Sequence, residues 1–393
     1  MDFDVFVVGG GPSGATAAWD LAREGRSVAM LDRAGRIKPC GGAIPPRAIK
    51  DFDIPDHLLV AKVETARMIS PTGRSVDIHI ENGFVGMVDR EDFDEFLRLR
   101  AVKEGAVRLT GTYLRIERDA DGSHVIWRDK ATGEERRTKT RLIIGADGAR
   151  SLVARDNVPG GDKIPYVIAY HEIVRAPAAN KSYDPKRCDV VYDGRISPDF
   201  YGWVFPHGDT ASIGMGSGID GVDLKQATAD LRASSGLTDC ETIRREGAPI
   251  PLHPLDCWDN ARDVVLAGDA AGVVAPSSGE GIYYAMVGGR VAGAAAHAFL
   301  QSGKVRDLRL ARKLFMKEHK TVFKVLRSMQ DAYYKSDERR ERFVSLCHDK
   351  DVQTLTFEAY MNKKLVAARP LAHIKIGLKN LAHLTRLVAP NWT

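Results

Sequence analysis

A glycine-rich turn near the start of the chain has the spacing that binds a dinucleotide pyrophosphate. Gly9, Gly11 and Gly14 form a G-x-G-x-x-G pattern, with Pro12 and Ser13 before the third glycine. Gly9 permits a tight turn, Gly11 lets the backbone approach a pyrophosphate, and Gly14 lets a helix pack on the preceding strand. The helix that follows would present unpaired N–H groups and a positive dipole end to the phosphates.

Asp32 completes this pattern, 18 residues beyond Gly14. It ends the next apolar stretch, where an acidic side chain accepts a hydrogen bond from a ribose hydroxyl. Arg33 follows directly and is a further candidate for cofactor contact. NAD and FAD proteins share this pattern, so it predicts a dinucleotide without identifying which one.

Two later motifs also place an acidic residue beside glycine at the end of an apolar stretch. The first is Asp147-Gly148, and the second is Gly268-Asp269. An acidic side chain in this position can bind a ribityl hydroxyl while the backbone passes a pyrophosphate. Each motif taken alone is equally well explained as a polar strand end. The loop after the second motif contributes three further candidates for cofactor contact: Pro276, Gly279 and Gly281.

The three motifs in this order resemble the FAD-dependent superfamily of aromatic hydroxylases and reductases. The resemblance implies FAD as the cofactor. It also implies that the second motif approaches both nucleotides and that the third holds the ribityl chain. Arg90, at the start of a predicted helix, matches a position that contacts the flavin in that superfamily. The alternative for Arg90 is a solvated helix start.

Two further motifs resemble the geranylgeranyl reductase family, and most closely its chlorophyll and bacteriochlorophyll branch. They are Lys38-Pro39-Cys40-Gly41-Gly42-Ala43 and Tyr201-Gly202-Trp203-Val204-Phe205-Pro206, the latter followed by Gly214-Met215-Gly216. The resemblance implies reduction of three of the four C=C bonds of a geranylgeranyl group, giving phytyl. The substrate would be either a free prenyl diphosphate or a prenylated tetrapyrrole, in which the geranylgeranyl group is esterified to a (bacterio)chlorophyllide. The resemblance covers nearly the whole chain and is weakest over 305–360.

Aromatic residues in the second motif suit this chemistry. A prenyl double bond is not polarised, so a proton must reach one carbon while hydride reaches the other, and positive charge develops. Aromatic faces stabilise such charge by roughly 0.5–2 kcal/mol each. Tyr201, Trp203 and Phe205 alternate, which places them on one face of a strand. We therefore predict that they line the substrate site, with Tyr201 and Trp203 as catalytic candidates; the alternative is ordinary core aromatics.

Cys40 is the third catalytic candidate and is also a candidate for flavin contact. It is a potential proton donor, a packing residue facing the flavin, or a small residue in a tight loop. Gly41 and Gly42 are expected to allow close approach of the backbone to the flavin ring.

The electron donor is not evident from a second binding motif. Gly214-x-Gly216-x-Gly218 has the wrong spacing for another dinucleotide fingerprint, and we interpret it as a strand end. We expect NADPH to bind transiently as the electron donor, with ferredoxin as the alternative.

Two kinds of element must position these motifs. Apolar strands are predicted at 3–9, 27–32, 141–147 and 263–269, and helices at 13–24, 90–104 and 281–300. Alternating stretches at 63–87 and 163–219 indicate antiparallel strands, and 36–58 is expected to be an irregular loop.

The pattern predicts an α/β protein with three regions. A Rossmann-like FAD-binding domain is discontinuous and comprises 1–60, 88–160 and 255–300. An interleaved antiparallel β-sheet substrate domain comprises 61–87 and 161–254. A helical C-terminal region comprises 301–393.

Composition excludes several classes of protein. The 393 residues are 44% hydrophobic, which is typical of a globular protein, and the net charge of +5 is too small to indicate nucleic-acid binding. The five cysteines lack C-x-x-C spacing, so neither a disulfide framework nor a metal site is predicted. The first residues form a strand rather than a signal peptide, and no run of 18 apolar residues occurs, so a cytoplasmic protein is expected.

The last segment, 361–393, is basic. It contains four lysines and two arginines and no acidic residue. Residues 371–388 place leucines, Ile374 and Val388 near one face, as in a basic amphipathic helix on an anionic membrane surface. The alternative is a helix packed on the body of the protein. Of these two interpretations, we expect the first: peripheral contact with the cytoplasmic face of a photosynthetic membrane through 361–393.

Two rival functions are compatible with the motifs. A flavin hydroxylase or epoxidase of the same fold would need oxygen. A non-catalytic prenyl-binding escort protein would need no intact flavin site, whereas every motif glycine and aspartate is present here.

Overall fold

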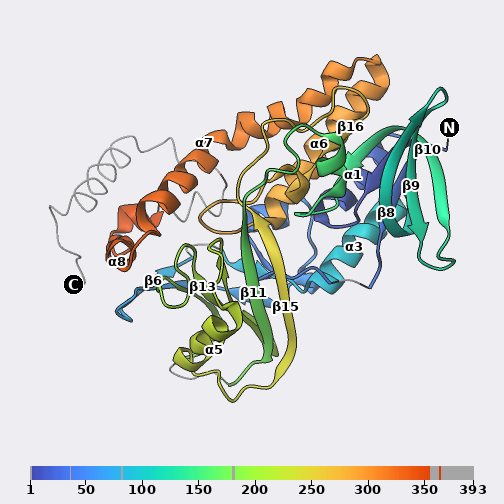
Figure 1. Cartoon of the computed structure of the whole chain (residues 1–393). Helices are drawn as coiled ribbons and strands as arrows, with labels where there is room; N and C mark the ends of the chain where they lie inside the picture. The colour runs from blue at the N-terminus through green and yellow to red at the C-terminus, as the bar shows by residue number, and fades with distance from the viewer. Residues whose placement is uncertain (1, 36, 81–82, 179–181, 355–362, 364–393) are drawn as a thin grey trace.

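The computed structural model describes residues 2–35, 37–80, 83–178, 182–354 and 363 (Figure 1). Its helices and strands confirm the predicted α/β class: a nucleotide-type sheet, a second sheet, and helices α7 (Leu310–Tyr333) and α8 (Asp337–Leu346) at the C-terminal side.

The first sheet has six strands in the order β1-β2-β8-β9-β10-β16, with β1 also pairing with β10. The sheet contains β1 (Phe3–Val8), β2 (Val28–Asp32), β10 (Glu135–Gly145) and β16 (Val264–Leu266), which run parallel. Three of them, β1, β10 and β16, are far apart in sequence and end at one edge of the sheet. β8 (Val107–Asp119) and β9 (Gly122–Asp129) extend the sheet as a hairpin.

One strand boundary was predicted wrongly. β10 begins at Glu135, not at residue 141. Its first half pairs antiparallel with β9 and is largely exposed, so it lacks the continuous apolar run that marks a buried parallel strand.

Helices α1 (Pro12–Arg23), α3 (Arg90–Lys103) and α6 (Ile282–Ser302) cover this sheet (Figure 1). α6 packs closely on α1 because its glycines leave room: a Cβ on Gly289 would lie 2.1 Å from the carbonyl oxygen of Ser13. The apolar stretch 285–300 is therefore a packed helix, as predicted. No helix within the described ranges is long and apolar enough to span a membrane.

The second sheet has seven strands in the order β15-β11-β14-β13-β12-β5-β6. It joins β5 (Thr65–Ile69) and β6 (Ser75–His79) to five later strands because β5 pairs parallel with β12. The later strands are β11 (Tyr166–Arg175), β12 (Arg187–Val191), β13 (Gly202–His207), β14 (Thr210–Ser217) and β15 (Thr242–Pro251). A small sheet of β3 (Ala43–Ile44), β7 (Val85–Met87) and β4 (Ala61–Val63) adjoins it.

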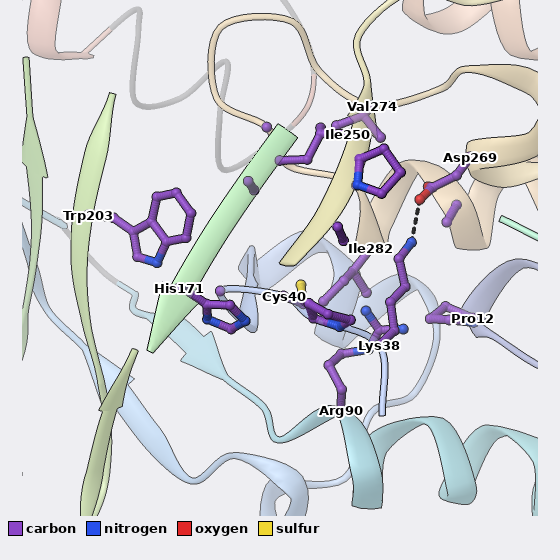
Figure 2. A pocket seen from close by; sticks show the side chains of 18 residues that line it. Pro12, Lys38, Cys40, Arg90, His171, Trp203, Ile250, Asp269, Val274 and Ile282 are labelled. Carbon is purple, nitrogen blue, oxygen red and sulfur yellow. Dashed lines mark hydrogen bonds and ion pairs between the residues drawn. The ribbon is translucent and has the colours of Figure 1, made fainter. Parts of the chain in front are cut away.

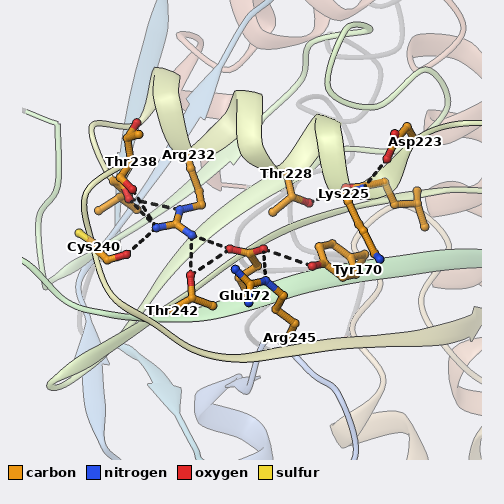
Figure 3. Close-up of polar contacts among 12 residues, drawn as sticks. Tyr170, Glu172, Asp223, Lys225, Thr228, Arg232, Thr238, Cys240, Thr242 and Arg245 are labelled. Atoms are coloured by element: carbon orange, nitrogen blue, oxygen red, sulfur yellow. Dashed lines mark hydrogen bonds and ion pairs between the residues drawn. The ribbon is translucent and has the colours of Figure 1, made fainter.

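The two faces of β11 have different tasks. Glu172 points to the face covered by α5 (Leu224–Ser234), a helix absent from the sequence prediction, and accepts from Arg232 Nη1 at 2.6 Å (Figure 3). Arg232 also donates to three loop carbonyls, which fixes the end of α5. Adjacent strand residues point to opposite faces, so His171 faces the other side, toward the cavity described below.

The segment 36–58 is less irregular than expected. It contains β3, α2 (Pro46–Asp51) and the 3-10 turn η1 (Asp56–Leu58). Pro46 occupies the first turn of α2, where its missing N–H is tolerated, and Arg47 pairs with Asp51 at 2.9 Å one turn later. The remaining short elements are α4 (Leu152–Asn157), η2 (Gly268–Ala271) and η3 (Val305–Arg309).

Candidate active site

The glycine-rich turn forms a closed cradle with one open position. A Cβ on Gly14 would lie 1.8 Å from the carbonyl oxygen of Gly9, which adopts φ +110°. A Cβ on Gly11 would meet nothing within 4 Å. Gly11 is the N-cap of α1, and no side chain caps that helix. The turn thus leaves free space directly at an uncapped helix N-terminus, where an anion binds well.

Asp32 lies at the end of β2, beside this turn. Its Oδ2 atom accepts from Arg108 Nη2 at 2.8 Å and lies 3.5 Å from Arg98 Nε. Both cations contact the same oxygen, so Oδ1 has a lone pair to offer a hydroxyl. Arg33 is exposed immediately after it. Ribose contact by these two residues stays a prediction.

Asp147 has a structural task in addition to the predicted one. Its carboxylate accepts from the Ser151 hydroxyl and from the N–H groups of Leu152 (2.8 Å) and Val153 (3.2 Å), at the start of α4. Burial raises the pKa of Asp147, while these hydrogen bonds oppose the rise. Gly148 adopts φ +87° beside it. Cofactor contact by this pair stays a prediction.

The third motif contacts the start of α1, directly after the glycine turn. A Cβ on Gly268 would lie 2.7 Å from the Ser13 side chain, so the two motifs are in contact. Asp269 forms an ion pair with Lys38.

The loop after Asp269 is held by two tyrosines. The Tyr201 hydroxyl donates to the Ser278 carbonyl at 2.5 Å, and the Tyr334 hydroxyl donates to the Ser277 carbonyl at 2.9 Å. Gly279 adopts φ +61° and lies against Phe200 and Tyr201. Pro276 precedes it and is buried. The loop after Asp269 is thereby held by Tyr201, just before β13, and by Tyr334, just after α7.

These features fit FAD. The Ser13 hydroxyl is buried beside Gly268 and has no hydrogen-bond partner among the described residues. An unpartnered buried hydroxyl is costly unless a ligand satisfies it. Together with the space at Gly11 and the Asp32 oxygen that neither arginine contacts, it provides polar groups for the phosphates and sugars of a dinucleotide.

A cavity lies where the two sheets meet (Figure 2). Figure 2 shows Lys38 extended to Asp269 on one side and Trp203 and His171 on the other. Eight predicted site residues line the cavity: Pro12, Cys40, Gly41, Arg90, Trp203, Asp269, Gly279 and Gly281. Lining residues that the sequence analysis did not assign to the site include Lys38, His171, Ala169, Ala248, Ile250, Val274 and Ile282.

The glycines of the 38–43 motif approach the second sheet. A Cβ on Gly41 would lie 3.1 Å from the ring of Phe205, and one on Gly42 would lie 2.5 Å from the ring of His207. Nε2 of His207 bonds to the carbonyl oxygen of Gly41 at 3.0 Å. The close approach seen here is therefore to strand β13, and approach to a flavin ring stays a prediction. Cys40 is half-buried at the tip of this loop.

Arg90 is buried rather than solvated at the start of α3. It forms a two-pronged ion pair with Asp94, at 2.8 and 2.7 Å. Burial opposes the charge, but Asp94 and Cys40 outweigh it and raise the pKa of Arg90, so the cavity wall carries a permanent cation.

The three motif aromatics form a continuous row. The ring centroid of Trp203 lies 6.2 Å from that of Tyr201 and 6.3 Å from that of Phe205. Trp203 lines the cavity, whereas Tyr201 and Phe205 flank it. Burial raises the pKa of Tyr201 well above its ordinary value. Its hydroxyl already donates to Ser278, so its predicted catalytic role has a competing structural explanation.

A buried polar group that was not predicted from the sequence lies beside Trp203. His171 Nδ1 bonds to Ser212 Oγ at 2.9 Å and Nε2 bonds to Glu246 Oε2 at 3.0 Å. Burial tends to raise the pKa of Glu246, but His171 and Arg244 outweigh it and lower that pKa. A lone histidine in a strand carries no sequence signal of such pairing, because its partners are 41 and 75 residues away.

The stretch from Gly214 to Gly218 contains a strand end, as predicted, because β14 ends at Ser217. Gly214 pairs with Trp203 on one side and with His171 on the other. A Cβ there would lie 2.4 Å from the Cβ of His171. The glycine therefore makes room for the two rings beside it.

The predicted basic segment 361–393 lies outside the described residues except for Lys363. That lysine is buried and pairs with Glu280 at 2.6 Å, in the loop after Asp269.

Comparison with known proteins places the chain in a family. Residues 4–355 match the family described as "Lycopene cyclase protein". The chain is 72% identical to "Geranylgeranyl diphosphate reductase" of Rhodobacter capsulatus, over 100% of both chains. It is 36% identical to the protein of that name from Synechocystis sp., over 98% of each.

Among solved structures, the fold is similar to that of a "geranylgeranyl bacteriochlorophyll reductase-like" protein from Thermoplasma acidophilum. The TM-score is 0.79 at 22% identity, and the match covers 98% of both chains. The "flavin-dependent brominase Bmp2" also matches, with a TM-score of 0.74 over 97% of this chain and 100% of its own, at 15% identity. The fold is thus that of flavin-dependent enzymes, and the chain belongs to the geranylgeranyl reductase family.

Proposed function

We propose that this protein is a flavin-dependent reductase that saturates three C=C bonds of a geranylgeranyl group in (bacterio)chlorophyll biosynthesis. One observation supports the proposal most strongly. Residues of the predicted FAD motifs, such as Pro12 and Asp269, line the same cavity as Trp203. The full-length similarity to reductases of this name supports it.

The chain's own residues divide the work. Gly11 and the α1 N-terminus would bind the pyrophosphate of FAD, Ser13 a phosphate or sugar oxygen, and Asp32 a ribose. When bound, the flavin supplies the hydride. Trp203 would orient the prenyl chain and stabilise positive charge on its tertiary carbon.

The remaining cavity residues would provide an apolar lining and a proton donor. Ala169, Ala248, Ile250 and Ile282 give the cavity an apolar lining that favours a hydrocarbon. Cys40 is the proposed proton donor to the alkene carbon, since Lys38 and Arg90 are held by carboxylates.

We propose NADPH as the electron donor, with ferredoxin as the alternative. The proposal rests on the lack of a second dinucleotide fingerprint, which favours a transient visitor. Anaerobic stopped-flow mixing of the oxidised holoenzyme with each donor distinguishes them: the true donor bleaches the flavin at a rate at least equal to turnover.

The decisive assay is anaerobic. Holoenzyme and NADPH would be incubated with geranylgeranyl diphosphate or geranylgeranyl-(bacterio)chlorophyllide, and product masses followed in steps of two hydrogens. Three steps on either substrate support the proposal and identify the substrate form. A product that appears only with oxygen and gains oxygen mass would instead establish the hydroxylase or epoxidase alternative.

The escort alternative is tested by colour. A reductase purifies with bound flavin or binds it when FAD is added. Folded protein that stays colourless in excess FAD would refute the reductase.

Peripheral membrane contact is proposed in addition. The described part of the chain supplies a surface for it on α7, where four exposed lysines lie on one face: Lys313, Lys317, Lys320 and Lys324. Leu314 and Val325 beside them are 40% and 39% exposed. Lysines that flank exposed apolar side chains favour binding to an anionic lipid surface. A prenyl substrate would itself be dissolved in such a membrane.

A further inference from the structure

Four residues form one rung across the second sheet. Trp203 on β13 pairs with Gly214 on β14, Gly214 pairs with His171 on β11, and His171 pairs with Glu246 on β15. Paired residues in a sheet point to the same face. Trp203 and His171 both line the cavity, so the whole rung faces the site.

Polar groups connect the rung from end to end. Trp203 Nε1 donates to Ser212 Oγ at 3.2 Å, Ser212 Oγ bonds to His171 Nδ1 at 2.9 Å, and His171 Nε2 bonds to Glu246 Oε2 at 3.0 Å. Ser212 is fully buried and His171 is 3% exposed. Gly214 is needed for this arrangement because a side chain there would collide with His171.

The hydrogen bonds can all run in one direction. Glu246 is ionised and accepts from Nε2–H, which leaves Nδ1 to accept the Ser212 proton, and the Ser212 oxygen then accepts the indole N–H. Each bond strengthens the next, because a group that donates its proton to a carboxylate gains electron density and becomes a better acceptor at its other end. The last member is the indole, whose face becomes more electron-rich as its N–H is polarised.

We propose that Glu246, His171 and Ser212 form a relay that orients Trp203 and increases the negative charge of its ring face. The proposal rests on the proposed function, in which the indole faces a developing carbocation. His171 and Glu246 are thus positioning residues that act through Ser212, and no proton needs to leave the chain of hydrogen bonds.

The test is a double-mutant cycle on the holoenzyme. Glu246→Gln keeps the shape of the side chain but removes its charge. We expect kcat for prenyl reduction to fall roughly tenfold, with KM and FAD content unchanged. In a Trp203→Phe background, which has no indole N–H, the same change should alter kcat less than about twofold.

Glu241→Gln is the matched control. Glu241 lies just before the same strand and pairs with Arg175 at 3.2 Å on the surface, with no link to His171. It should leave kcat unchanged. Additive effects of Glu246→Gln and Trp203→Phe, or an equal loss from Glu241→Gln, would overturn the relay.

A spectroscopic readout separates this relay from the reaction itself. The chain has five tryptophans, so ¹⁵N-indole labelling gives a simple spectrum in which Trp203→Phe identifies one peak. Glu246→Gln and Ser212→Ala should each shift the Trp203 N–H proton upfield, whereas Glu241→Gln should not. An unmoved peak refutes the relay even if prenyl reduction is found. A shifted peak in a protein that reduces no prenyl group would refute only the proposed function.

Discussion

At the scale of single residues, two glycines of the first motif have different tasks. Gly14 is closed in by the backbone of Gly9, whereas the space beside Gly11 is open in the protein alone. The first is thus a requirement of packing and the second a requirement of the ligand. Variants at the two positions separate these requirements.

Gly11→Ala should fold normally and bind FAD weakly, because its φ of −76° suits alanine and the methyl group would occupy space for the pyrophosphate. Gly14→Val should abolish FAD binding and destabilise the fold. Flavin absorbance per protein and thermal unfolding measure both effects. Gly83→Ala, whose Cβ would make ordinary contacts at 3.7 Å, is the control. A fully flavin-loaded Gly14→Val variant would exclude this site.

Trp203→Phe should lower prenyl reduction by about 2- to 30-fold while FAD content stays constant, because a smaller ring gives a weaker cation–π interaction. Trp203→Ala should lower it further. Product mass per bound flavin is the measurement. Unchanged reduction in the alanine variant would remove Trp203 from the proposed site.

At the scale of elements, α6 and α7 enclose an unusual histidine. His319 on α7 is fully buried, and its ring contacts those of Tyr283, Tyr284 and Phe315. The ring centroid of Phe315 lies 4.8 Å from that of His319. Neither ring nitrogen has a hydrogen-bond partner among the described residues. Burial lowers the pKa of His319 to about 4, so the folded protein keeps it neutral.

This histidine predicts acid sensitivity. The folded pKa of His319 is about 4, below its ordinary 6.5, so the unfolded chain binds the extra proton between these values. Stability is therefore full above pH 6.5 and falls as the pH drops toward 4, by roughly 3 kcal/mol from this group. His319→Phe should remove that dependence and stabilise the protein at neutral pH by about 1 kcal/mol or more.

Urea unfolding of both proteins at pH 7 and pH 5 provides the measurement. His57→Phe, at a surface position away from this cluster, is the control and should leave the pH dependence unchanged. A His319→Phe protein whose stability still falls in parallel with the parent would contradict a neutral buried His319.

At the scale of the whole molecule, the C-terminal helices contact both the loop after Asp269 and the aromatic residues near the cavity. Tyr334, after the end of α7, bonds to the loop that follows Asp269, and Phe343 of α8 packs on Tyr192, whose ring contacts Tyr201. The exposed face of α7 carries the row of four lysines described above.

Replacing Lys313, Lys317, Lys320 and Lys324 by Gln should weaken binding to anionic vesicles, since each lysine near such a surface contributes about 1 kcal/mol. Co-sedimentation with phosphatidylglycerol vesicles at low and high salt is the measurement. The same number of exposed lysines elsewhere serves as the control: Lys103, Lys163, Lys186 and Lys225. Equal sedimentation of both variants would exclude α7 as the contact.

Truncation after Lys363 tests the basic tail separately. It retains the buried Lys363–Glu280 pair, so the loop after Asp269 should be unaffected. If residues beyond it contact lipid, vesicle binding should fall while FAD content stays constant. Equal binding by the shortened chain would favour the packed-helix alternative.

The sequence by itself determined the strand–turn–helix unit of the first motif and several of the other elements, because these depend on local rules. Apolar strands at 3–9, 27–32 and 263–269 and helices at 13–24 and 90–104 match the structure within a few residues. Gly9, Gly11 and Gly14 are explained by the backbone path of a single strand–turn–helix unit. The spacing of Tyr201, Trp203 and Phe205 likewise placed all three on one strand or at its start.

Only the tertiary structure decided which groups face one another. His171, Ser212 and Glu246 lie on three different strands and come together through sheet register, which no periodicity encodes. Tertiary structure also decided the ion pair of Lys38 with Asp269 and the hydrogen bond of Tyr334 to the loop after Asp269. It likewise decided that Gly214 leaves room for the rings of His171 and Trp203. Sequence patterns report the environment of one element at a time, whereas an active site is built from contacts between elements.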